Sequence, residues 1–208
     1  MQQQLSVELI DVSKKFGQRQ LFSGINASVK SGECLAVTGC NGSGKSTLLK
    51  LVAGIGRPTC GLIRTLSHGR QLDAQEHAGV LGMVSPEIIF YHAMTAVENI
   101  LFLTHARGIT CTLAAAQNYC HAVGLQADGD AFVRAFSTGM RQRLKFAVLL
   151  AVQPSLWLLD EPSSNLDVEG KKLVGVMIAA ALERKVAVMI ATNEGWEAQY
   201  ASHTITLG

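Results

Sequence analysis

Hydrophobic residues occur in short runs of strand length that alternate with longer, helix-like segments. The first two runs, at 7–12 and 21–29, are bounded by turn-forming glycines at 17 and 24 and predict an antiparallel layer near the beginning of the chain. Later apolar runs predict buried strands, and they lie at 34–38, 80–84, 155–160 and 186–192. Helical segments are expected after three of these strands, starting at 48, 138 and 168. Strands that alternate with helices are typical of a parallel sheet, so the pattern predicts an α/β fold with a mainly parallel core.

The middle of the chain has a different composition from its two ends. From about 95 to 135 the segments are alanine-rich and helical, with breaks expected at Gly108, Gly124 and 128–130, while 54–61 is predicted to be a turn. There is no internal repeat and no linker long enough to separate two full domains. We therefore expect a single domain over 1–208, with a helical insertion subdomain at approximately 85–153.

Composition limits the classes of protein to which the chain can belong. Of its 208 residues, 48% are hydrophobic and 16% are charged, with a net charge of +2. No run reaches the ~18 uncharged apolar residues of a membrane span, and the first residues lack the pattern of a signal peptide. The apolar composition indicates either surface that is buried against a partner or an ordinary α/β core rich in Val, Leu and Ala.

Charge and cysteine content give no indication of nucleic-acid binding or of a disulfide framework. Lys and Arg are scattered, without the basic stripe that a nucleic-acid partner requires. The five cysteines are odd in number and include no C-x-x-C pair, which indicates neither a zinc site nor paired disulfides. A reducing, cytoplasmic location fits this usage.

Residues 39–47 read Gly-Cys-Asn-Gly-Ser-Gly-Lys-Ser-Thr, a complete G-x-x-x-x-G-K-S phosphate-binding loop between a predicted strand and a predicted helix. Its glycines allow backbone N–H groups to face phosphate oxygens, and Lys45 adds a positive charge beside the β- and γ-phosphates. The hydroxyl of Ser46 is placed to ligate Mg²⁺. The motif predicts a P-loop NTPase that binds a nucleoside triphosphate through Gly39, Cys40, Asn41, Gly42, Ser43, Gly44, Lys45, Ser46 and Thr47.

Two adjacent carboxylates follow the predicted strand at 155–160. Ligands of open α/β sheets bind at the carboxyl ends of the strands, where Asp160 and Glu161 lie. Beside a phosphate-binding loop, Asp160 is expected to hold Mg²⁺ and Glu161 to polarise the water that attacks the γ-phosphorus. Mg²⁺ and a nucleoside triphosphate are therefore the expected cofactors, and the family resemblance described next implies that the nucleotide is ATP.

In their order and spacing, these motifs resemble the ATP-binding subunit of ABC transporters over nearly the whole chain. Phe16 stands where this family has an aromatic residue that stacks on adenine, and Phe136-Ser-Thr-Gly-Met-Arg141 stands where it has its signature sequence. Pro162 and Ser164-Asn-Leu-Asp167 match the loop that contacts a partner subunit. By this resemblance, Ser137 and Gly139 bind the γ-phosphate of ATP held by an opposite subunit. Without this resemblance, the position of Ser137 before a predicted helix indicates only a helix N-cap.

Two positions depart from the family's pattern. Pro86 takes the place of a glutamine that bridges Mg²⁺ and water, so that Glu87 becomes the candidate ligand. Asn193 takes the place of a histidine after the last core strand, and asparagine cannot carry a proton at neutral pH. Hydrolysis is expected to remain possible through Glu161, with Lys45 and Asn193 as the other catalytic candidates, and to be slow or partner-dependent.

The resemblance implies an ATP-binding and hydrolysing subunit that energises a separate transmembrane permease through ATP-driven closure of a dimer. The second ATPase subunit would be another copy or a paralogue, and the chain would lie in the cytoplasm, peripheral on the inner face of the plasma membrane. Residues 88–91 are candidate permease contacts or part of a local core. The short length resembles the ATPase of the haem-exporter, cytochrome c maturation type. Two alternatives remain: a weakly hydrolysing regulatory subunit of a heterodimer, and an ABC-type nucleotide-gated clamp without a transport role.

Overall fold

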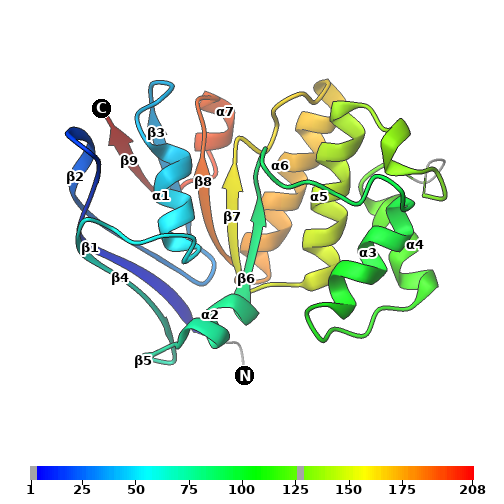
Figure 1. Ribbon diagram of the computed structural model, residues 1–208, viewed down its shortest axis with the longest axis horizontal. Helices are drawn as coiled ribbons and strands as arrows, with labels where there is room; N and C mark the ends of the chain where they lie inside the picture. Colours follow the sequence, from blue (N-terminus) through cyan, green and yellow to red (C-terminus); the bar gives the residue numbers. More distant parts are fainter. Residues whose placement is uncertain (1–3, 126–128) are drawn as a thin grey trace. The chain divides into compact units, whose positions relative to one another are not determined.

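The computed structural model describes residues 4–125 and 129–208, and its contacts divide the chain into two compact units (Figure 1). The first unit comprises Met1–Met83, Ser155–Glu161 and Met177–Gly208, and the second comprises Val84–Pro154 and Pro162–Val176. Of the predicted break at 128–130, position 128 lies outside the described residues.

An antiparallel sheet occupies the beginning of the first unit, which confirms the predicted β layer. Its strand order is β2-β1-β4-β5, with bounds β1 Leu5–Phe16, β2 Arg19–Lys30, β4 Cys60–Ser67 and β5 Arg70–Gln71. The turn predicted at Gly24 is wrong, because Gly24 lies inside β2 with a φ of +66°, beside register shifts between β1 and β2. The predicted turn over 54–61 overlaps β4, a strand that the hydrophobic pattern missed because its first three residues are exposed.

The second sheet of this unit has the order β6-β7-β8-β3-β9, and its bounds are β3 Cys34–Gly39, β6 Leu81–Val84, β7 Leu156–Asp160, β8 Ala187–Ala191 and β9 His203–Leu207. Strand β3 is parallel to both β8 and β9, and β7 is parallel to β8. The mainly parallel core is therefore confirmed. Strands β7 and β8 are buried at every residue, as expected for strands with both faces covered.

Helix α1 (Lys45–Val52) joins the two sheets of the first unit in one hydrophobic core. Leu48 and Leu49 are completely buried, in a cluster that contains Val7 of β1 and Leu35 of β3. Each fully buried leucine contributes roughly 1.5–3 kcal/mol to the stability of the fold. The packing fixes the direction of α1 and, with it, the position of the loop that precedes it. Two short helices complete the unit, α2 (Ala74–Val80) and α7 (Gly195–Ala198).

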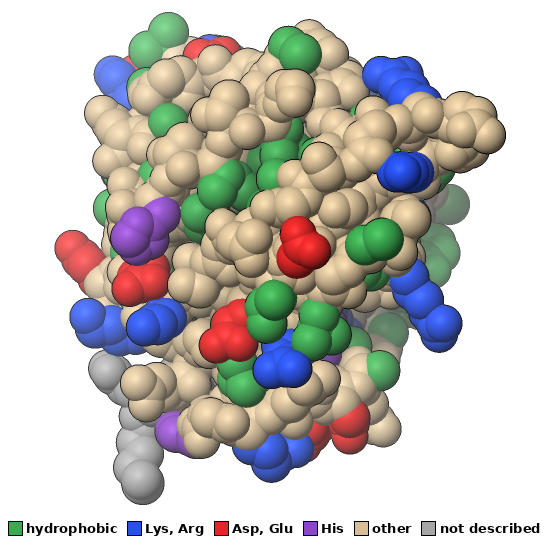
Figure 2. All heavy atoms as spheres, turned by 90° about the vertical axis from the view of Figure 1, so that its left-hand side faces the viewer, with side chains coloured by type: hydrophobic (Ala, Val, Ile, Leu, Met, Phe, Trp, Pro, Cys, Tyr) green, Lys and Arg blue, Asp and Glu red, His purple; other side chains and the backbone are tan. Residues whose placement is uncertain are grey.

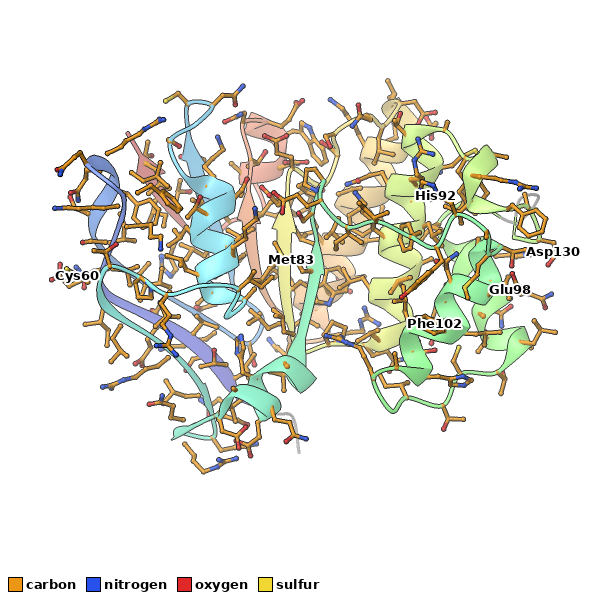
Figure 3. The ribbon with its side chains drawn as sticks, in the orientation of Figure 1. Cys60, Met83, His92, Glu98, Phe102 and Asp130 are labelled. Atoms are coloured by element: carbon orange, nitrogen blue, oxygen red, sulfur yellow. The ribbon has the colours of Figure 1, made fainter. Side chains whose placement is uncertain are left out.

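The second unit is helical, with α3 (Ala96–His105), α4 (Leu113–Ala122), a 3₁₀ turn at Val133–Ala135 and α5 (Thr138–Val152). A further helix, α6 (Val168–Glu183), begins in this unit and ends in the first. Thr95 and Glu98 form a capping box at the start of α3. Phe102 of α3, which is labelled in Figure 3, points its ring edge-on to that of Tyr91, with ring centroids 4.8 Å apart.

The charged side chains on the face shown in Figure 2 are of both signs and are interspersed with one another. All five cysteines are free. In the part of the chain that the structure describes, no helix combines the length and the hydrophobicity that crossing a bilayer requires.

Candidate nucleotide site

Three segments meet at one edge of the parallel sheet because their strands are neighbours. Val37 of β3 and Asp160 of β7 both pair with Ala191 of β8. The phosphate-binding loop follows β3, Glu161 follows β7 and Asn193 lies just beyond β8. Because the three strands are neighbours, these three segments lie side by side. Backbone hydrogen bonds tie the three together, from Glu161 N to Ala191 O at 2.9 Å and from Thr192 N to Val37 O at 3.1 Å.

Two glycines of the phosphate-binding loop have no room for a side chain. Gly39 has a φ of +138°, and a Cβ there would lie 2.1 Å from Leu207 O. Gly44 is the N-cap of α1 with a φ of +106°, and its Cβ would lie 2.7 Å from the side chain of Leu21. The spacing of the motif is thus required by backbone conformation and by close packing.

Lys45 is the charged centre of the loop. Its side chain is buried, and Nζ donates to Gly39 O at 2.8 Å and to Cys40 O at 3.1 Å. Ser43 Oγ is also buried and makes no hydrogen bond to any described residue. A buried ammonium that contacts only neutral carbonyls, beside an unpaired hydroxyl, fits the binding of an anionic group such as phosphate.

Two oxygen atoms next to the loop fit a divalent cation. Ser46 Oγ donates to Asp160 Oδ1 at 2.9 Å, and the Asp160 side chain is almost completely buried. Hydroxyl and carboxylate oxygens are the ligands that Mg²⁺ prefers, and it usually binds through few protein groups together with substrate phosphates. Ser46 and Asp160 therefore form a suitable pair.

Glu161 borders a cavity of about 340 Å³, which is lined by Phe16, Leu21, Asn41, Gly42, Gly44, Lys45, Ser46, Thr47 and Glu161. Phe16 is 57% exposed, and Lys14 Nζ lies 5.0 Å from the centroid of its ring. An exposed aromatic face at the rim of the cavity suits a planar base. Leu21 was not among the site residues predicted from the sequence. Leu21 lies in β2, which pairs with β1 close to Phe16, and this nearness in sequence to Phe16 could have indicated its place in the site.

Asn193 contacts the phosphate-binding loop directly. Its Nδ2 donates to Asn41 Oδ1 at 2.7 Å, which links the loop after β8 to the loop after β3. Sequence reasoning placed both residues in the site but did not foresee this bond, because they are separated by 152 positions.

Asn193→Asp is expected to weaken Mg-ATP binding about tenfold, because a carboxylate cannot donate to Asn41 Oδ1 and adds negative charge near the phosphates. The measurement is ATP affinity by equilibrium titration. Gln199→Glu, which adds the same charge at an exposed position beyond α7, is the control and should leave affinity unchanged. Equal affinities of Asn193→Asp and wild type would show that the amide bond has no part in the site.

The remaining predicted site residues, Glu87, Ser137 and Gly139, belong to the second unit. Ser137 Oγ accepts from Met140 N at 3.1 Å and so caps α5. A Cβ on Gly139 would lie 3.2 Å from Asn165 O. Close packing within the chain therefore already favours glycine at this position. Glu87 is exposed.

Two side chains of α5 hold the loop after Pro162, and sequence reasoning did not single out either. Gln142 is buried, and its Nε2 donates to Pro162 O at 2.7 Å. Arg143 pairs with Asp167, whose carboxylate also accepts from Gly170 N at 2.8 Å. This backbone hydrogen bond, together with Arg143, lowers the pKa of Asp167. The loop and the start of α5 therefore form one connected surface.

Comparison with known proteins agrees with this arrangement. The family model described as ABC transporter matches residues 22–164. The chain is 34% identical over 181 residues to the cytochrome c biogenesis ATP-binding export protein CcmA of Rhizobium johnstonii, covering 86% of this chain and 83% of that protein. It is 32% identical over 204 residues to CcmA of Pseudomonas aeruginosa, covering 97% and 99%. A dimeric ATP-binding cassette in a post-hydrolysis state, bound to ADP and Pi, superposes with a TM-score of 0.82 at 25% identity, covering 97% of this chain and 94% of that one.

The family match extends over more than half of the chain and includes the phosphate-binding loop, the signature segment and the two carboxylates. These are the features on which the resemblance found in the sequence rested, and that resemblance is confirmed. The chain belongs to the ABC transporter family, as an ATP-binding subunit and ATPase.

Proposed function

We propose that this subunit binds Mg-ATP at the edge of its parallel sheet and hydrolyses it, as one of a pair of ATPase chains, to energise a separate membrane permease. The observation that supports this most directly is that Lys45, Ser46 and Glu161 line one cavity, while the buried Asp160 accepts a hydrogen bond from Ser46 at its edge. Together they supply a positive charge for the phosphates, two oxygen ligands for a divalent cation and a carboxylate that can accept a proton from water, which are the groups that phosphoryl transfer to water needs.

Each residue has a defined task in this proposal. The loop amides and Lys45 bind the β- and γ-phosphates, and Ser46 and Asp160 hold Mg²⁺, which neutralises phosphate charge. Glu161 accepts a proton as the water oxygen bonds to the γ-phosphorus, while the bond from that phosphorus to the bridging oxygen breaks and ADP leaves. Phe16 stacks on the adenine. Asn193 keeps the loop in place through Asn41.

The second unit supports the proposed pairing of two chains. Ser137 begins an α-helix whose N-terminal N–H groups favour an anion, and the loop that follows Pro162 is fixed beside it by Gln142. We assign Ser137 and Gly139 to the γ-phosphate of ATP that is bound by the opposite subunit, in another copy of this chain or in a paralogue. Glu87 is assigned to Mg²⁺ or its water shell in the closed dimer. The predicted organisation, a helical subdomain inserted in a single ATP-binding domain, belongs to the same proposal.

The permease would dock on exposed apolar residues of the second unit. Ile89 is 79% exposed and Tyr91 is 50% exposed, which makes them suitable contacts. Of the two alternatives for residues 88–91, Phe90 fits the local core, because it is only 4% exposed. A peripheral position on the inner face of the plasma membrane follows from such docking.

Export in cytochrome c biogenesis is the transport process that the relatives favour, since two of them carry that name at 32–34% identity over most of the chain. The test is a strain from which the gene for this chain has been deleted, in which c-type cytochromes are detected by haem staining. Loss of these cytochromes, restored by the wild-type chain but not by Glu161→Gln, supports the assignment. Unchanged cytochrome c content would exclude it and leave the transport ATPase role intact.

A weakly hydrolysing regulatory subunit is the second candidate, and Asn193 is the observation that favours it. An amide cannot take up the proton or the charge that a histidine would carry. The two candidates differ in the turnover of the assembled complex when only this chain carries Glu161→Gln. Turnover falls strongly if this chain is the working ATPase and changes little if it is regulatory.

A further inference from the structure

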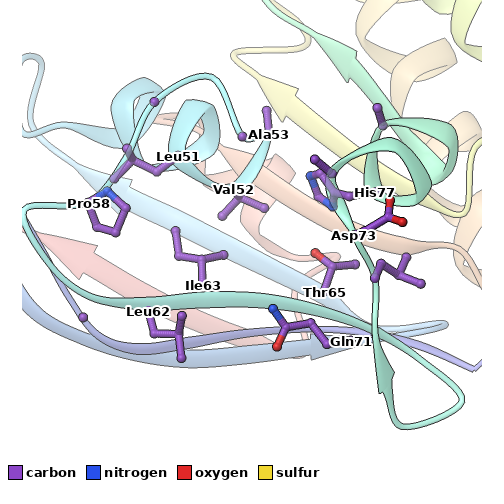
Figure 4. A pocket seen from close by; sticks show the side chains of 16 residues that line it. Leu51, Val52, Ala53, Pro58, Leu62, Ile63, Thr65, Gln71, Asp73 and His77 are labelled. Atoms are coloured by element: carbon purple, nitrogen blue, oxygen red, sulfur yellow. The ribbon is translucent and has the colours of Figure 1, made fainter.

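Lys145 of α5 is a buried basic residue that the proposed chemistry does not use. It is only 8% exposed, and burial together with the charge of Arg141 lowers its pKa, so a charged lysine is costly at this position. The buried ring of His77 in α2, which extends toward Val52 in Figure 4, has the backbone of that residue as its partner. Lys145 instead donates to a neutral side chain, Gln142 Oε1, at 3.2 Å. This bond connects Lys145 to the loop after β7, because Gln142 holds that loop.

Lys145 fixes the direction in which the amide of Gln142 points. An ammonium can only donate hydrogen bonds and a carbonyl can only accept them. With Lys145 on one side and the carbonyl of Pro162 on the other, only one orientation of the amide satisfies both. In that orientation Oε1 accepts from Lys145, and Nε2 donates to Pro162 O at 2.7 Å. Gln142 is 4% exposed and Pro162 is buried, so little water competes for these bonds.

The carbonyl of Pro162 is connected to the backbone of Glu161 by few rotatable bonds. The peptide bond is planar and the proline ring fixes φ, so that ψ of Glu161 and ψ of Pro162 are the soft torsion angles between Glu161 Cα and the oxygen that Gln142 holds. On its other side, Glu161 N donates to Ala191 O at 2.9 Å. The backbone of Glu161 is therefore held from both directions.

Glu161 needs this support because its backbone is strained. Its φ is +46°, a left-handed conformation that is unfavourable for a residue with a Cβ, and the residue before a proline normally prefers extended backbone. Residues in such conformations persist where their surroundings fix them. Without the hold on Pro162, the backbone would relax toward negative φ and turn the carboxylate of Glu161 away from the nucleotide cavity that it borders.

We propose that Gln142, oriented by Lys145, is a positioning residue for the carboxylate of Glu161. The two hydrogen bonds fix the carbonyl of Pro162, and through the proline ring they keep Glu161 in the left-handed conformation in which its carboxylate faces the attacking water. The proposal rests on the role of Glu161 as general base in the proposed function. It gives Gln142 and Lys145 no contact with ATP.

The test is the ATP turnover and the ATP affinity of Gln142→Glu. Glutamate keeps the shape of glutamine and still accepts from Lys145, but it cannot donate to Pro162 O when ionised. We expect kcat for phosphate release to fall about tenfold, because a misplaced general base is inefficient, while the equilibrium affinity for ATP stays at the wild-type value. Gln117→Glu makes the same change at an exposed position of α4, and as the control it should leave both values unchanged.

Lys145→Met separates positioning from a contribution to folding. Methionine keeps most of the length of the lysine side chain but removes the buried ammonium and the donor that orients the amide of Gln142. We expect the thermal unfolding temperature to rise, because a buried charge is removed, while kcat falls about threefold. A purely structural role would move stability and turnover in the same direction.

A double variant shows whether Gln142 acts through Glu161. Once Glu161 is replaced by glutamine, Gln142→Glu should cause no further loss of phosphate release in a single turnover. Losses that multiply in the double variant would overturn the proposal, and so would wild-type turnover of Gln142→Glu alone. Wild-type turnover of Glu161→Gln alone would instead contradict the proposed function, so the two failures are distinguishable.

Discussion

Replacement of Glu161 by glutamine is expected to abolish ATP turnover while ATP binding is kept. The carboxylate borders the nucleotide cavity, and the backbone N–H of the residue is fixed by Ala191 O at 2.9 Å, so the amide will occupy the same place. An amide cannot accept the proton of the attacking water, and loss of a general base costs about 10²–10⁴-fold in rate. Phosphate release measures the first effect, and equilibrium binding of ATP measures the second.

Glu183→Gln is the matched control for this experiment. It makes the same chemical change at an exposed position at the end of α6 and should leave turnover at the wild-type value. Residual activity of Glu161→Gln above about a tenth of wild type would mean that another group takes the proton.

Replacement of Lys45 by alanine should remove ATP binding itself. Lys45 Nζ is buried under the loop and, among the described residues, donates to the carbonyls of Gly39 and Cys40, so its charge is available to the phosphates. Charge-assisted bonds in such a dry site are strong, and we expect ATP affinity to fall by about 100-fold or more.

Lys50→Ala provides the comparison, since it removes a lysine from the last turn of the same helix. It should bind ATP normally. If Lys45→Ala retained wild-type affinity, the phosphate-binding assignment of the loop would be wrong, whatever the turnover of the variant.

The sequence predicted the buried elements well and the exposed ones poorly. The strand over 155–160 and the helix from Thr138 to Val152 were placed to within a residue, because the buried strand is a short apolar run and Ser137 marks the start of the helix. Strand β9 was missed, since only Leu207 of its five residues is buried and an exposed edge strand has no hydrophobic signature. Strand β4 was missed for a related reason, because it begins with three exposed residues.

The features of the nucleotide site also fall into those that could be predicted from the sequence and those that could not. The phosphate-binding loop and Asp160-Glu161 could be found because each is contiguous in sequence and follows an apolar strand. The bond between Asn41 and Asn193 and the support of Pro162 by Gln142 arise from folding of distant segments. No local pattern encodes them, and only the coordinates of the neighbouring strands and helices reveal them.

The claim that one complete site needs two chains is tested most directly by mixing two inactive variants. Lys45→Ala lacks the phosphate-binding charge, and Ser137→Asp keeps a good N-cap while placing a carboxylate toward the phosphate of the opposite chain. Each alone should be inactive. Their equimolar mixture should recover about a quarter of wild-type phosphate release, because half of the pairs are mixed and each mixed pair contains one intact site out of two. A mixture no more active than its components, with wild type active under the same conditions, would contradict a site shared between two copies of this chain.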